Sequence, residues 1–267
     1  MQEILKTINK FIDEMGYINN PHFLGVYFYG SSYSGFAEND SDIDLHVIFD
    51  DFDKTHIYRG VHFIENTKIE YFEKCISDLY LSVDNDIKER NIAWHSMLAT
   101  SYIVYDKTGE LAELQKYTLN AYKKGLPKLD EQDTYEYISI IDNRMQKLKK
   151  AYEQNSPHFY HLYHITIEKI RRFYHSINGL PRINTSKIYK IYQNDEYRKS
   201  YYPGKFVSQE FKDIYFDLIN PNIQDKQKLY EKLLNFYNYV KAGKSLPNKN
   251  YRIKIKSRNI SSNKKPC

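Results

Sequence analysis

The stretch YGSSYSGFAENDSDIDLHVIFDD, residues 29–51, decides how the first half of the chain is interpreted. It holds a Gly-Ser pair, a polar loop, and then Asp42 and Asp44 at the head of an apolar segment. Alternate side chains of a β-strand share a face. In a strand over residues 43–49, the odd-numbered positions are apolar and form a core face. Asp42, Asp44 and His46 therefore share the opposite face, which we expect to be exposed.

Two carboxylates side by side repel each other unless a cation neutralises them. Mg²⁺ suits this position because it prefers carboxylate oxygens together with phosphate oxygens and water. Upstream, Gly30 and Ser31 directly follow an expected strand over residues 23–29. Glycine lets the backbone approach a ligand closely, and small hydroxyl residues leave N–H groups available to phosphate. A phosphate cradle beside a carboxylate pair is what metal-dependent nucleotide chemistry requires.

Gly30-Ser31, a spacer of ten residues and then Asp42-Ile43-Asp44-Leu45 resemble the signature of the DNA polymerase beta-like nucleotidyltransferase superfamily. The resemblance covers roughly residues 20–110 and implies a third carboxylate on a neighbouring strand. Glu70, within an expected strand over residues 68–72, takes that position, where the family often has Asp.

The resemblance also implies roles for these residues. Asp42, Asp44 and Glu70 would form the catalytic set and hold one or two Mg²⁺ ions. Nucleotide phosphates would bind at Gly30 and Ser31, with Ser41 close by. Glu70 could be a metal ligand or the base that acts on the acceptor hydroxyl, and Glu168 is a second candidate for that base.

The implied reaction moves a nucleoside monophosphate, by default AMP from ATP, to an acceptor hydroxyl and releases pyrophosphate. Length and architecture most resemble the antibiotic nucleotidyltransferases, which modify aminoglycosides or lincosamides, so a small-molecule acceptor is expected. Three alternatives remain open. The acceptor could be a protein side chain, as in AMP-transferring toxins, or an RNA 3′ end. The chain could also be a binding module that keeps the fold without turnover.

The order of expected elements indicates an α+β protein. A small mixed-sheet nucleotidyltransferase domain over residues 1–124 precedes an all-α helical-bundle domain over residues 131–245. Besides an N-terminal helix, the expected elements are strands 23–29, 43–49, 58–64, 68–72 and 102–105, and helices 77–100, 110–122, 131–154, 157–178, 184–195, 208–219 and 222–242.

One expected helix carries an unusual polar stripe. Within residues 157–178, His161, His164, Glu168, Arg172 and His175 fall within about 80° of one another around the helix axis. This stripe is either an outer face or the lining of a cleft between the two domains. The two histidines three residues apart lack a third ligand that would indicate zinc.

The whole chain narrows the class of protein. Its 267 residues are 41% hydrophobic, which is enough for a packed core. Two cysteines favour a reducing compartment, and no apolar run approaches the ~18 residues of a membrane span, so we expect a cytoplasmic protein without a membrane partner. The net charge is +5, yet residues 249–267 alone carry seven Lys and Arg and no acid. We expect this basic tail to be flexible and do not expect nucleic acid as a partner. The pattern does not indicate an oligomeric state.

Overall fold

The structure, a computed structural model, describes residues 1–37, 41–53, 56–202, 204–220, 222 and 225–242. The chain forms two compact units, each made of two segments: Met1–Pro127 with Gly179–Ser208, and Lys128–Asn178 with Gln209–Cys267. The expected α+β class is confirmed. We predicted continuous domains over 1–124 and 131–245, whereas residues 179–208 group with the first unit. The basic tail at 249–267 lies outside the described residues.

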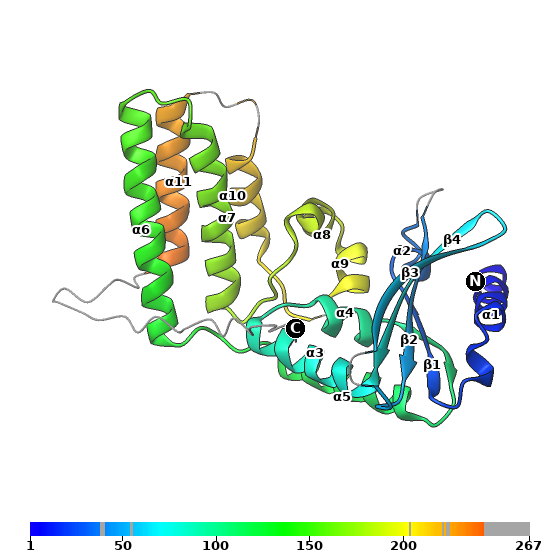
Figure 1. Cartoon of the computed structure of the whole chain (residues 1–267). Coiled ribbons are helices and arrows are strands. Elements are labelled where there is room, and N and C mark those ends of the chain that lie inside the picture. The colour runs from blue at the N-terminus through cyan, green and yellow to red at the C-terminus, as the bar shows by residue number, and fades with distance from the viewer. Residues whose placement is uncertain (38–40, 54–55, 203, 221, 223–224, 243–267) are drawn as a thin grey trace, which may run out of the picture. The chain divides into compact units, whose positions relative to one another are not determined.

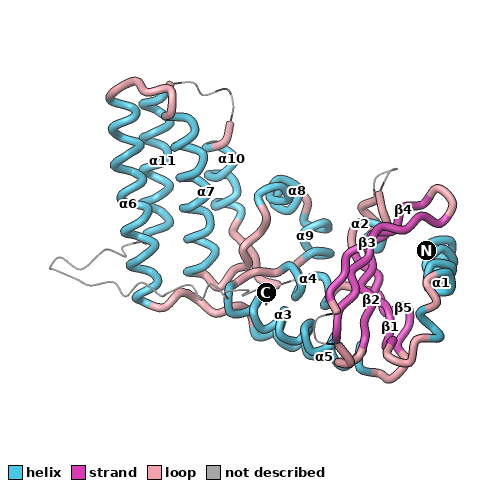
Figure 2. The backbone as a smooth tube through the Cα atoms, in the orientation of Figure 1, coloured by secondary structure: helices cyan, strands magenta, loops and turns pink. Residues whose placement is uncertain are grey.

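A five-stranded sheet organises the first unit (Figures 1 and 2), in the order β3-β4-β2-β1-β5. β2 and β4 are parallel, and every other neighbouring pair is antiparallel. All five expected strands are present. Their bounds are β1 Phe23–Tyr29, β2 Ile43–Phe49, β3 Ile57–Ile64, β4 Thr67–Cys75 and β5 Tyr102–Asp106.

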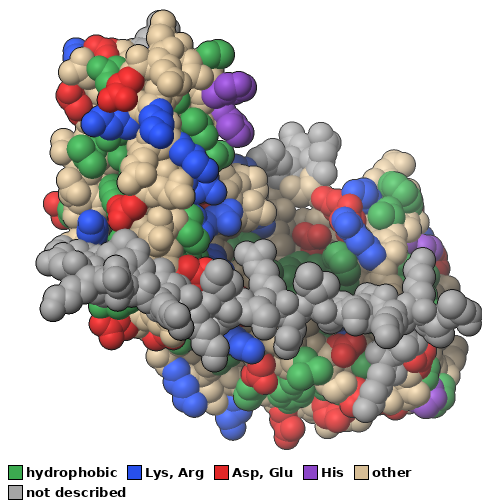
Figure 3. All heavy atoms as spheres, turned by 60° about the vertical axis from the view of Figure 1, so that its left-hand side comes forward, with side chains coloured by type: hydrophobic (Ala, Val, Ile, Leu, Met, Phe, Trp, Pro, Cys, Tyr) green, Lys and Arg blue, Asp and Glu red, His purple; other side chains and the backbone are tan. Residues whose placement is uncertain are grey.

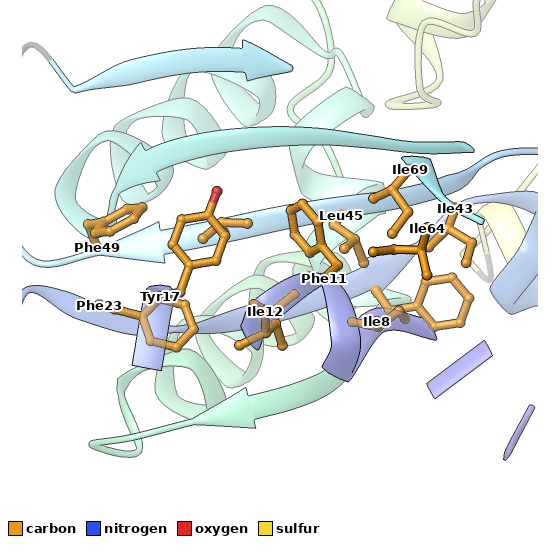
Figure 4. Packing of buried hydrophobic residues seen from close by; sticks show 13 residues of the cluster. Ile8, Phe11, Ile12, Tyr17, Phe23, Ile43, Leu45, Phe49, Ile64 and Ile69 are labelled. Atoms are coloured by element: carbon orange, nitrogen blue, oxygen red, sulfur yellow. The ribbon is translucent and has the colours of Figure 1, made fainter. Parts of the chain in front are cut away.

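Helix α1 (Gln2–Glu14) covers one face of this sheet. Its apolar residues recur at helical spacing, so one stripe of the helix meets the odd-numbered positions of β2. Figure 4 shows Ile8, Phe11 and Ile12 packed against Leu45 and its neighbours. This confirms that residues 43, 45, 47 and 49 form a core face.

The opposite face is covered by α3 (Ile76–Glu89), α4 (Ala93–Ala99) and α5 (Glu110–Lys124). We expected one helix over 77–100, but the chain turns at Arg90, which adopts a left-handed conformation at φ 59° and ends α3. Our expectation that this face of β2 is exposed was wrong beyond its first residues. His46 is buried, and its ring lies 4.9 Å from that of Trp94 in α4. Only the end that carries the aspartates stays open.

The segment 179–208 contributes three short helices to the first unit: η2 Thr185–Lys187, α8 Ile188–Gln193 and α9 Asp195–Tyr201. We expected a single helix over 184–195 and did not foresee α9. Hydrogen bonds hold the segment in place. The backbone N–H of Arg182 donates to the Arg90 carbonyl at 2.8 Å. The hydroxyls of Ser96 and Tyr122 both donate to the Tyr201 carbonyl.

The second unit is helical, with α6 Glu131–Glu153, α7 Phe159–Ile177, α10 Gln209–Leu218 and α11 Lys226–Lys241. On its visible face, acidic and basic side chains are interspersed (Figure 3). In the stripe on α7, His161 and His164 are exposed, as expected for an outer face, but His175 is fully buried. Its ring lies 6.2 Å from that of Phe211, so α10 covers this end of the stripe. Among the described residues, no helix has the length and hydropathy that crossing a membrane would require.

Candidate active site

The sheet register brings the three predicted carboxylates together. In β2, Asp44 is paired with Tyr29 of β1 on one side and with Glu70 of β4 on the other. Because paired residues of neighbouring strands project to the same face, Asp44 and Glu70 point to one side of the sheet. Asp42 lies one residue before β2, and a single amino group bonds both Asp42 and Glu70.

Of the three carboxylates, Asp44 has the surroundings that most disfavour its charged form. Burial, and then the charges of Asp42 and Glu70, raise the pKa of its carboxyl to about 6, although Lys187 and Lys68 oppose the shift. Among the described residues, no hydrogen-bond donor or ion-pair partner reaches its carboxylate. A half-buried, charged carboxylate without a partner is unfavourable, so this position calls for a cation.

The other two carboxylates already have partners. Lys68 Nζ lies 2.8 Å from Asp42 Oδ2 and 2.6 Å from Glu70 Oε1. Arg59 Nη2 lies 3.1 Å from Glu70 Oε2. The hydrogen bond from Lys68 is the main reason that the pKa of Asp42 lies below its usual value. Lys68 and then Arg59 do the same for the pKa of Glu70. Within the described part of the chain, no three His, Cys, Asp or Glu side chains stand as a ready metal-binding group.

Gly30 is required by the close approach of Asp44. Its φ of 85° lies in a region that L side chains rarely adopt, and a Cβ there would stand 2.3 Å from Asp44 Oδ2. The short helix α2 (Ser31–Ser34) begins immediately afterwards. The first N–H groups of a helical turn lack an intrahelical acceptor, so Ser31 can offer its N–H to a ligand. The Ser32 hydroxyl donates to the Asp42 carbonyl at 2.7 Å and ties this turn to the start of β2.

A cavity of about 420 Å³ opens beside Asp44, entirely within the first unit. Gly30, Ser31 and Asp44 line it, together with Lys187 and Tyr201 from the segment 179–208. Lys187 Nζ lies 4.6 Å from the centre of the Tyr201 ring and 3.5 Å from its hydroxyl. Ser41, which precedes Asp42, is not among the described residues that line this cavity. Among its described lining residues, the cavity thus combines the Gly-Ser turn, Asp44 and one lysine.

A family model described as "Nucleotidyltransferase domain" matches residues 5–240. The chain belongs to this family. Family membership supports the transfer of a nucleoside monophosphate in general, and the superfamily that the Gly30-Ser31 and Asp42/Asp44 pattern indicated is confirmed at that level.

The fold of this family member also has a relative among solved structures. It aligns with the crystal structure of a nucleotidyltransferase-like protein from Exiguobacterium sibiricum 255-15 with a TM-score of 0.50 and 11% identity. The alignment covers 90% of this chain and 75% of the other. At this identity the likeness concerns the fold alone. No curated protein matches the sequence.

Glu168, the second candidate for the general base, lies in α7 of the helical unit. Arg171 Nε donates to Glu168 Oε2 at 2.9 Å, and Arg172 Nε donates to Glu168 Oε1 at 3.0 Å. Burial raises the pKa of Glu168, but these two guanidinium groups lower it by more, so the pKa lies below its usual value. A carboxylate held this way is a weak proton acceptor.

Lys68, Lys187 and Arg59 contribute to the site and were not singled out from the sequence. Lys68 stands two residues before Glu70, so it lies on the same face of β4, and this spacing could have indicated their contact. Lys187 lies more than 140 residues beyond Asp44 in the sequence. Only the packing of the segment 179–208 on the first unit brings it to the cavity, and no local pattern signals that.

Proposed function

We propose that the chain transfers a nucleoside monophosphate from an NTP, by default ATP, to an acceptor hydroxyl and releases pyrophosphate. One observation carries this proposal. The carboxylate of Asp44, which has no hydrogen-bond or ion-pair partner among the described residues, lies against Gly30 at the head of a strand. It also lines a cavity that contains a lysine. Such a site suits an anionic ligand that arrives with a divalent cation.

Asp42, Asp44 and Glu70 fit Mg²⁺, because they offer only carboxylate oxygens and no described residue forms an ion pair with Asp44. When bound, the metal would offset the charge of the triphosphate and of the transition state. The N–H groups of Gly30 and Ser31 would orient phosphate oxygens, which places the α-phosphorus for in-line attack.

Lys187 gives the cavity its second phosphate partner in this proposal. Among the described residues that line the cavity, it is the cation, and its charge reaches Asp44, whose pKa it lowers. Its stacking on Tyr201 fixes the direction of a long and flexible side chain. The ammonium group would therefore neutralise triphosphate oxygens in the cavity.

Glu70 acts in this proposal as a metal ligand and not as the base. A base must accept a proton near neutral pH. The Glu70 carboxylate instead accepts hydrogen bonds from Lys68 and Arg59, and its pKa lies below its usual value. Both features favour the charged, ligating form.

For the acceptor, we propose a small hydroxyl compound such as an aminoglycoside or a related antibiotic, handled in the cytoplasm. Support comes from the length of the chain and from a helical unit that follows the sheet unit. A cavity of about 420 Å³ falls within the range of sites that hold small molecules. Tyr33, Tyr197 and Tyr201 line the same cavity and offer ring faces to a nucleobase or to a sugar.

The experiment is a screen of NTPs labelled at the α-phosphorus against aminoglycosides, lincosamides, protein extract and RNA, with Mg²⁺ present. Label should move to one small acceptor in the wild type and not in Asp44→Asn. Label on protein would favour an AMP-transferase that acts on polypeptides. Nucleotide binding without pyrophosphate release across the whole panel would favour an inactive binding module.

A further inference from the structure

Lys68 forms ion pairs with two carboxylates of the proposed metal site. Its ammonium bonds Asp42 at 2.8 Å and Glu70 at 2.6 Å, so it holds two of the three carboxylates of the proposed metal site. No lysine or arginine among the described residues forms such a bond with Asp44. A cation that draws Asp42 and Asp44 together must therefore compete with Lys68 for Asp42.

The backbone explains why Lys68 can both reach these carboxylates and leave them. β4 begins at Thr67, directly after the turn at Glu65, so Lys68 lies beside the turn that joins β3 and β4. Its side chain is 40% exposed, and only the flexible tip makes the two ion pairs. Exposed pairs of this kind are weak and exchange readily with solvent.

Glu70 would not be left alone if Lys68 moved away, because Arg59 Nη2 still lies 3.1 Å from its other oxygen. Asp42 has no second cation of this kind among the ion pairs of the described residues. Departure of Lys68 therefore leaves Asp42 without an ion-pair partner among the described residues. Asp42 lies beside Asp44, whose carboxylate has no such partner in the described part of the chain either. Removal of the lysine therefore leaves the Asp42 carboxylate without its counter-charge, and a metal ion bound there would replace that charge.

We propose that Lys68 is a built-in counter-cation that holds the carboxylates of the metal-free site and is displaced when a divalent cation enters. This rests on the proposed function, since it takes Asp42, Asp44 and Glu70 to be the metal ligands. Lys68 is a positioning residue here. It keeps Asp42 and Glu70 near each other before the metal arrives, and it lowers the intrinsic affinity of the site for the metal.

The test is a titration of the full chain with Mn²⁺ in the absence of nucleotide. Electron paramagnetic resonance measures the free Mn²⁺ at each step. Lys68→Met should bind Mn²⁺ about 3- to 10-fold more tightly than the wild type, the range expected when two partly exposed ion pairs no longer compete. Lys68→Arg keeps the charge and should stay close to the wild type. In EDTA, Lys68→Met should unfold at a lower temperature, and Mn²⁺ should stabilise it more than it stabilises the wild type.

Lys232→Met is the matched control. Lys232 bonds both oxygens of Asp217 in the helical unit, so this variant also loses two contacts of a lysine with carboxylate oxygens, away from the site. It should leave Mn²⁺ affinity unchanged. If the wild type binds Mn²⁺ and Lys68→Met binds it equally or more weakly, the competition is overturned. If the wild type does not bind Mn²⁺, or binds it no better than Asp44→Asn, the metal site itself fails and this inference fails with it.

Discussion

Gly30→Ala should damage both the stability and the metal site of this protein, because the backbone and the neighbouring carboxylate each exclude a side chain there. The residue has φ 85° and ψ −165°, a conformation that is essentially restricted to glycine. A Cβ would stand 2.3 Å from Asp44 Oδ2, whereas ordinary contacts begin near 3.4 Å. The Asp44 oxygen would have to withdraw by about 1 Å.

These two effects have separate magnitudes. The backbone strain alone costs about 1–3 kcal/mol. At about 2–4 °C per kcal/mol for a protein of this size class, the melting temperature should fall by roughly 2–12 °C. A displacement of about 1 Å at a reacting group lowers turnover by about 10²-fold. Mn²⁺ affinity should fall as well, because Asp44 is a proposed ligand.

Gly35→Ala provides the matched control, since Gly35 also has a positive φ, 80°, but nothing lies within 4 Å of an added Cβ. It should lose about 1–2 kcal/mol of stability from the left-handed backbone and keep both Mn²⁺ affinity and pyrophosphate release. Thermal unfolding in EDTA, Mn²⁺ titration and pyrophosphate release with the acceptor found in the screen separate the variants. Wild-type turnover and Mn²⁺ affinity in Gly30→Ala would refute the claim that Gly30 is needed to place Asp44.

The remaining predictions concern the charged residues. Asp42→Asn and Asp44→Asn should each abolish pyrophosphate release while circular dichroism stays unchanged, and retained turnover in both would remove the metal site. Asp44→Asn should also raise the melting temperature in EDTA at pH 7. The folded chain binds the Asp44 proton more tightly than the unfolded chain, with a pKa of about 6 against 3.8, so this gain should shrink as the pH falls through about 6 toward 4. A gain that grows in acid would contradict the burial of that charge. Glu70→Gln should raise the Mg²⁺ requirement, with partial rescue by excess Mg²⁺, whereas loss of the acidic limb of the rate profile without rescue would mark Glu70 as the base. Lys187→Met should raise the KM for the NTP by roughly 10-fold or more at nearly constant kcat, and an unchanged KM would remove Lys187 from phosphate binding.

Much of the sheet could be predicted because its strands have a strict local signature. Alternation of apolar residues over 43–49 identified one buried face of β2, and burial against α1 confirmed it. The turn at Glu65 falls in the gap between the expected strands 58–64 and 68–72. The family resemblance was also needed to predict that Glu70 lies beside Asp44. Alternation indicates which face of a strand a residue occupies, but not which strands are neighbours in the sheet. The chemical roles of Asp42, Asp44 and Glu70 stay predictions.

Other features depend on which surfaces pack together, and local patterns do not carry that information. The periodicity of residues 184–195 indicated helix, but not that this segment packs on the first unit and brings Lys187 to the cavity. His175 belonged to a polar stripe by angle, yet α10 covers it. His46 shared a face with the aspartates, yet Trp94 closes that face. Burial lowers the pKa of His46 to about 3, so a neutral ring fills the space.

We propose that the Asp42/Asp44 site moves the α-phosphoryl group of a nucleotide, and position-specific labelling is a direct test of this proposal. The acceptor from the screen is incubated with Mg²⁺ and ATP labelled either at the α- or at the γ-phosphorus. Only the α-label should reach the acceptor, and the γ-label should leave as pyrophosphate. The Asp44→Asn variant should transfer no label and release no pyrophosphate. Transfer of the γ-label to the acceptor, or α-label transfer that survives in Asp44→Asn, would contradict it.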